Sequence, residues 1–72
     1  MNGEVHLLDV VALTEDRVEH RLSRGQVGTI VEYLAPGVYE VELSDNDGRT
    51  YATVALPAAQ LMVLHHQPLS AA

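Results

Sequence analysis

The sequence predicts an all-β domain, a small barrel of five short strands with one long loop after the first strand and a 3-10 turn before the last. Three observations indicate this class. Apolar and β-branched residues come in runs of strand length rather than helix length. Turn-forming Pro-Gly and Asn-Asp-Gly sequences separate those runs. The chain has only 72 residues, which suffices for one domain with a single small core.

The first strand is expected at Leu7–Leu13, a β-branched-rich run that is too short for an ordinary helix. A polar stretch follows as far as Gln26. Within it, Val18 and Leu22 have the four-residue spacing of one helical turn, but a single pair is weak evidence for a helix. We therefore expect a long solvated loop, with both side chains folded back over the barrel.

The central hairpin is expected in RGQVGTIVEYLAPGVYEVEL, residues 24–43. Its first strand spans Val27–Leu34, and Ala35-Pro36-Gly37 form a three-residue turn in which the glycine accepts a positive φ. A two-residue turn would mix glutamates into both faces. Because a one-residue slip reverses every side chain, burial of one face selects the register. The side expected to face the core consists of Val27, Thr29, Val31, Tyr33, Tyr39, Val41 and Leu43.

The opposite side of this hairpin mixes apolar and acidic residues. Glu32 lies directly across from Glu40 in this register, and like charges so placed are mildly destabilising. An arginine from the long loop, a basic partner or solvent screening could each relieve the repulsion. We treat this side as a hypothetical partner-binding surface with an apolar centre and an acidic rim. Its residues are Ile30, Glu32, Leu34, Val38, Glu40 and Glu42.

The turn Ser44–Arg49 leads into a strand expected at Thr50–Pro57, whose register stays open. A three-residue loop would pair Asp45 with Arg49 and send the odd-numbered side chains of the strand inward. A four-residue loop would send the more apolar set inward, and we favour it for that reason. That inward set is Ala52, Val54 and Leu56.

One helical turn is expected at Ala58–Gln60, started by the preceding proline. A fifth strand, Leu61–His65, follows, and its edge is a candidate for pairing with a second copy of the chain. The ordered core is expected at about residues 5–66 of a single 72-residue domain, with a flexible tail at 67–72. This order of elements, with one long excursion after the first strand, is typical of an SH3-like barrel.

The charge balance argues against nucleic acid as a partner. Ten acidic residues face four arginines, and the formal net charge is −6 at pH 7. Binding to nucleic acid rests mostly on phosphate neutralisation by Lys and Arg. Three of the arginines lie in the long loop, where acidic residues alternate with them. Recognition of polyproline is also disfavoured, because the chain has three tyrosines but no tryptophan and no phenylalanine.

No motif indicates catalysis, a metal or a cofactor, so we expect a protein that is not an enzyme. There is no cysteine, and no serine has a base and an acid placed by motif. His65 and His66 are adjacent on the expected strand, so their side chains point to opposite faces. Residues 45–48, DNDG, begin like a calcium loop but lack its later ligands. No signal peptide or membrane segment is visible, and we expect a cytoplasmic protein.

Three motifs, DVVAL at residues 9–13, GQVGTIV at 25–31 and YEVE at 39–42, resemble a small bacterial family catalogued as domain of unknown function 4926. The resemblance covers about Leu7 to Leu64. It implies a stand-alone or accessory SH3-like domain of a bacterium with no assigned activity. The GxVGTIV core also resembles the ribosomal KOW motif, which implies the same fold class and an RNA-binding alternative.

The expected function is therefore non-enzymatic protein binding. The partner is expected to be basic, and a small antitoxin or immunity protein would bind in this way. Self-association is also expected, because a small domain without disulfides commonly gains stability from a second subunit. The alternatives are a KOW-like nucleic-acid or ribosome-associated module and a structural subunit that serves only assembly.

Overall fold

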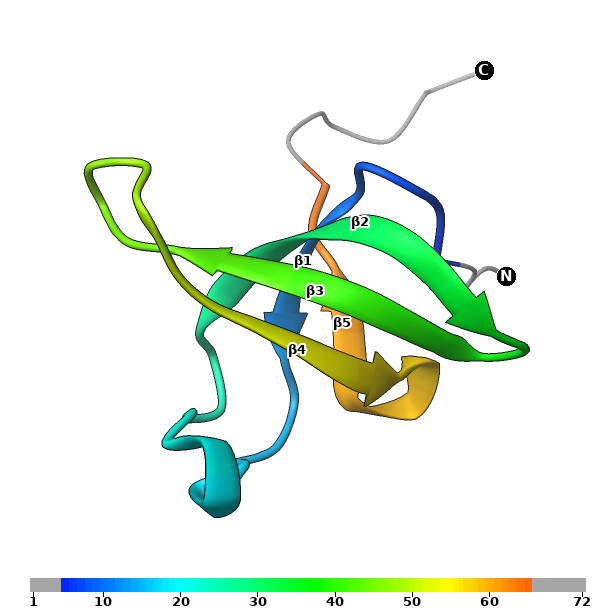
Figure 1. Cartoon of the computed structure of the whole chain (residues 1–72), viewed down its shortest axis with the longest axis horizontal. Helices are drawn as coiled ribbons and strands as arrows, with labels where there is room; N and C mark the ends of the chain where they lie inside the picture. Colours follow the sequence, from blue (N-terminus) through cyan, green and yellow to red (C-terminus); the bar gives the residue numbers. More distant parts are fainter. Residues whose placement is uncertain (1–4, 66–72) are drawn as a thin grey trace.

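The computed structural model describes residues 5–65 of the chain and confirms the all-β class. Five strands form one antiparallel sheet, and the described residues contain no α-helix. Two 3-10 turns, η1 and η2, lie in the connections (Figure 1). The elements are β1 Val10–Leu13, η1 Val18–His20, β2 Val27–Ala35, β3 Val38–Ser44, β4 Thr50–Pro57, η2 Ala58–Gln60 and β5 Leu61–Val63.

The sheet has the strand order β4-β3-β2-β1-β5 and is not closed, so β4 and β5 are its two edges. The long strand β2 pairs with β1 through its first residues and with β3 from Gly28 to Ala35. In Figure 1, β1 and β5 cross behind β3 and β4, so the sheet folds over onto itself. A barrel describes this arrangement only loosely, and the SH3-like detail stays a prediction.

The core fills the space between the two halves of this folded sheet. Every strand contributes to one contiguous cluster of buried apolar side chains, and Val5 and Leu22 add to it from outside the strands. The strand members of the cluster are Val11, Leu13, Ile30, Val41, Leu43, Val54, Leu56 and Leu61.

The long loop is a loop, as predicted, with η1 as a single 3-10 turn. Backbone hydrogen bonds in both directions join Arg17 and Leu22, at 2.8 and 3.0 Å. This closure turns Leu22 into the core, where it is 4% exposed, and leaves η1 protruding into solvent. The predicted inward packing is confirmed for Leu22 and wrong for Val18, whose side chain is 81% exposed.

The central hairpin has a two-residue turn, so the predicted three-residue turn is wrong at its tip. Ala35 pairs with Val38, which leaves only Pro36 and Gly37 between the strands. Leu34 is then an extra residue on β2, and beyond it the predicted pairs occur. These are Tyr33 with Tyr39 and Glu32 with Glu40.

A second extra residue, Val31, shifts the register again, so that Ile30 rather than Val31 pairs with Val41. The predicted inward face is therefore right for β3, where Val41 and Leu43 are fully buried. It is wrong for β2 from Val27 to Val31, because the bulge exchanges the side chains that point inward. Ile30 is fully buried, whereas Val31 is 38% exposed, and Val27 is exposed as well. Thr29 pairs with the outward Glu42. Tyr33 keeps the predicted pairing with Tyr39, and the two ring centroids are 5.7 Å apart, but near the hairpin turn its side chain is exposed.

The turn between β3 and β4 combines both registers that the sequence left open. At the tip, the Asp45 N–H donates to the Arg49 carbonyl at 2.9 Å, as in the three-residue loop. Tyr51 is then an extra residue on β4, and Leu43 pairs with Ala52 beyond it. The favoured inward set is thereby confirmed. Val54 and Leu56 are buried, and Ala52 packs against the core.

The outer strands are shorter than predicted. The first strand begins at Val10, because Leu7 and Leu8 form an exposed turn in which Leu8 has a φ of 70°. The last strand ends at Val63 rather than at His65. The predicted helical turn before it is confirmed as η2. The tail predicted at residues 67–72 lies outside the described residues, as does His66.

Candidate protein-binding surface

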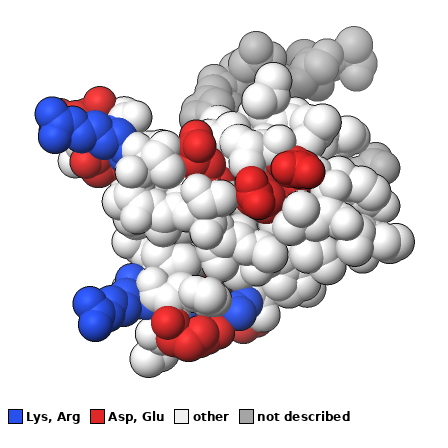
Figure 2. All heavy atoms as spheres, viewed as in Figure 1, with Lys and Arg blue, Asp and Glu red and all other residues white. Residues whose placement is uncertain are grey.

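Three of the predicted site residues lie together on the outward side of β2 and β3. Glu32 pairs directly with Glu40, and Glu42 follows two residues later on the same side of β3. We call Glu32, Glu40 and Glu42 the acidic face. Figure 2 shows acidic atoms gathered over this part of the sheet with no basic atoms among them.

The apolar centre predicted for this surface is only partly present. Ile30 belongs to the core and is 0% exposed, so the prediction that it lies on the binding surface is wrong. The bulge at Val31 turns its side chain inward. Leu34 is 43% exposed and Val38 is half-buried, and both remain accessible near the hairpin turn. The surface is therefore an acidic face with an apolar margin at one end.

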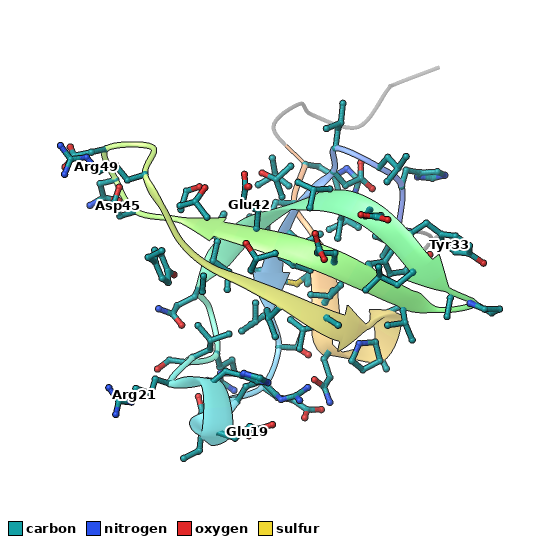
Figure 3. The ribbon with its side chains drawn as sticks, viewed as in Figure 1. Glu19, Arg21, Tyr33, Glu42, Asp45 and Arg49 are labelled. Carbon is teal, nitrogen blue, oxygen red and sulfur yellow. The ribbon has the colours of Figure 1, made fainter. Side chains whose placement is uncertain are left out.

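None of the described arginines pairs with the acidic face. Arg17 binds Glu19 at 2.8 Å, and its Nη1 donates to the Gln60 side chain at 2.6 Å. The ion pairs between side chains of residues 5–65 do not include the three glutamates. Figure 3 shows the same separation: Glu42 lies over the middle of the sheet, Arg49 at the β3–β4 tip and Arg21 at η1.

Relief of the Glu32–Glu40 repulsion by an arginine of the long loop is thus excluded within the described part of the chain. Solvent screening and a basic partner remain. The pKa of Glu19 lies below its ordinary value because of a backbone hydrogen bond at Glu19 and the Arg17 guanidinium. The charge of Arg17 therefore stabilises a carboxylate of the long loop and not the acidic face.

Small uncharged residues of β4 flank the acidic face. Ala55 pairs with Glu40, and Thr53 pairs with Glu42, so both lie on the outward side. Both are exposed. At these two positions, therefore, only small side chains stand between the carboxylates and the edge of the sheet.

The sheet has a longer free edge than the predicted one. The predicted edge, the last strand, is β5, which does end the sheet but has only three residues. The other edge, β4, has eight residues and carries no charge. The absence of charge was visible in the sequence, whereas the strand order that makes β4 an edge was not.

Two further observations concern other kinds of site. Among residues 5–65, no three His, Cys, Asp or Glu side chains come close enough to hold a metal ion. No helix in the same residues has the length and apolar character needed to cross a membrane.

The profile of the family described as Domain of unknown function (DUF4926) matches residues 7–63 of the 72-residue chain. The chain belongs to this family, which confirms the resemblance seen in its DVVAL, GQVGTIV and YEVE motifs. No curated protein and no solved structure matches it.

Proposed function

We propose that this domain is a non-enzymatic protein-binding module whose acidic face receives a basic surface of another protein. The observation that carries the proposal is the position of Glu32, Glu40 and Glu42 on one side of the hairpin, without an arginine of the described residues beside them. A cytoplasmic antitoxin-like or immunity-like protein is one setting in which a basic partner would be neutralised in this way.

Charge repulsion supports the proposal. Two carboxylates about 6 Å apart in water repel each other by on the order of 0.5–1 kcal/mol, and less as salt is added. Glu32 and Glu40 are in this cross-strand arrangement in the free protein. A basic partner would turn the repulsion into attraction, and complementary charge also speeds the encounter of two proteins.

The test is capture of partners from an extract of the native host, read by quantitative mass spectrometry. The variant Glu40→Lys plus Glu42→Lys reverses charge on the acidic face. The matched control, Glu15→Lys plus Asp47→Lys, makes the same change in net charge at exposed loop positions. We expect the wild type and the control to recover the same basic protein and the acidic-face variant to lose it.

Recovery of the same proteins by all three forms would contradict the proposal. Thermal unfolding of each variant shows whether it is folded before the comparison is made. A separate titration with RNA at low and moderate salt addresses the alternative function. Salt-sensitive binding at micromolar concentration would favour the KOW-like nucleic-acid module instead.

A further inference from the structure

The free edge of β4 lies one strand away from the acidic face. Only β3 hydrogen-bonds to β4, and no other described backbone or side-chain group does so. Alternate residues of an antiparallel strand direct their N–H and C=O groups away from the paired strand. About half of the β4 backbone groups therefore face outward from the sheet, available to another strand.

This edge lacks the features that usually prevent strand addition. Exposed edges are commonly protected by charged side chains, by proline, by a bulge or by shortness. The strand β4 has eight residues and no charge, and its one proline, Pro57, is its last residue. Its bulge at Tyr51 lies close to the other end, which leaves a regular stretch from Ala52 to Leu56.

Charge decides what kind of strand fits. Neighbouring strands lie about 4.8 Å apart, so a strand added outside β4 would lie about 10 Å from β3. A long basic side chain on the added strand could cross Ala55 or Thr53 and meet Glu40 or Glu42. The small size of both β4 residues leaves this path open. A second copy of the chain would instead offer an uncharged β4 and add a second net charge of −6.

We propose that the β4 edge binds an extended segment of the partner by strand addition, and that this segment carries lysine or arginine at alternate positions. The basic side chains lie on the outward side and reach the acidic face. The intervening side chains lie on the inner side, beside Val54 and Leu56, and are apolar. This inference rests on the proposed function and adds to it the form of the ligand.

The probe is a ten-residue synthetic peptide of alternating lysine and valine, with binding followed by fluorescence anisotropy. Two further peptides carry N-methyl groups on the backbone, one on the lysine amides and the other on the valine amides. Their charge is the same, but each has lost hydrogen bonding along one edge only. We expect one methylated peptide to lose binding at least tenfold and the other to keep it.

On the protein side, the substitution Glu40→Gln plus Glu42→Gln should weaken binding of the unmodified peptide about tenfold at low salt. Amide hydrogen exchange should slow at alternate residues of β4 when the peptide binds. Equal binding of all three peptides would overturn strand addition and leave charge attraction alone, in which case the proposed function still stands. Failure of the proposed function shows separately, as host capture that is insensitive to the acidic-face charge reversal.

Sedimentation of the free protein over a range of concentrations tests whether a second copy of the chain binds this edge instead. A monomer agrees with the proposal. A dimer that Thr53→Lys plus Ala55→Lys dissociates would overturn it and assign the edge to a second copy. The same lysine variant should repel the basic peptide, and its unfolding curve serves as the check that it is folded.

Discussion

Gly28 provides the sharpest stability prediction, because the space for a side chain at this position is already occupied. A Cβ atom there would lie 2.8 Å from the Glu42 backbone oxygen, 2.8 Å from Val41 Cγ1 and 3.0 Å from Leu43 Cδ2. The nearest backbone atom belongs to the paired strand, and the two side chains are fully buried. The substitution Gly28→Ala must therefore push β2 away from β3 or displace the core.

The expected cost is about 2 kcal/mol, within the range of 1–3 kcal/mol for overpacking of a close-packed site. A domain of this length has a total stability of about 4–11 kcal/mol. For a chain of this size, the loss should lower Tm by about 10 °C. Backbone preference alone would act in the opposite direction, since alanine is favoured over glycine within a strand.

The assay is urea unfolding followed by circular dichroism, together with a thermal scan. The control is Gly37→Asn at the hairpin turn, where a Cβ meets nothing within 4 Å, so that only the strain of the positive φ of 74° opposes the substitution. We expect the control to lose at most about 1 kcal/mol, because a positive φ costs asparagine less than most other residues with a side chain. If Gly28→Ala is as stable as the wild type or more so, the steric argument is refuted.

Three further predictions concern charged side chains. Replacing Glu40 with Gln removes the repulsion from Glu32 and should raise stability by about 0.5 kcal/mol at low salt; unfolding in 1 M salt should abolish the gain, and a gain that persists there would contradict the electrostatic origin. The substitution Asp45→Ala removes the carboxylate that accepts two backbone N–H groups of the β3–β4 turn, at 2.9 and 3.0 Å; chemical unfolding should show a loss of about 1 kcal/mol, whereas Asp45→Asn should retain most of the stability. Replacing Arg17 with Ala should raise the pKa of Glu19 part of the way toward its ordinary value, since the backbone hydrogen bond remains. Because the pKa of Glu19 is lowered in the folded protein, the ionised Glu19 carboxylate stabilises the fold at pH values above its ordinary pKa, and this stabilisation is lost as the pH falls through the lowered pKa. An unchanged titration of the Glu19 carboxyl group by NMR would argue against the ion pair.

The order of the elements could be predicted because short β-branched runs and turn residues determine it locally. The Pro-Gly and Asn-Asp-Gly sequences mark both tight turns, and the polar stretch before Gln26 marks the long loop. The inward set of β4 could be chosen because only one register buries the apolar residues. These features depend on neighbours in the sequence, which is why they were readable.

The face of β2 could not be predicted, because it depends on two bulges. Val31 and Leu34 are residue types common in strands, so the sequence does not show that both are extra residues without a pairing partner on β3. Since one extra residue reverses the side chains beyond it, Ile30 was placed on the surface and Val31 in the core. The glutamates nearest the turn were placed correctly, because the register between the two bulges is the predicted one.

The free edge of β4 was missed for a different reason. Hydrogen bonding between β1 and β5 joins segments far apart in the sequence, and this pairing determines which strands end the sheet. Spacing along the chain carries no information on it. The acidic face could thus be predicted in part, whereas its position beside an unpaired edge required the structure.

The pairing of β1 with β5 also affects when the domain can finish folding during its synthesis. Val11 pairs with Val63 across nearly the whole described chain, while β2, β3 and β4 pair only with near neighbours. Contacts so distant in sequence form slowly and require both segments to be present. The meander with its acidic face can therefore assemble on a nascent chain, but one side of β1 stays open until the last strand has been translated.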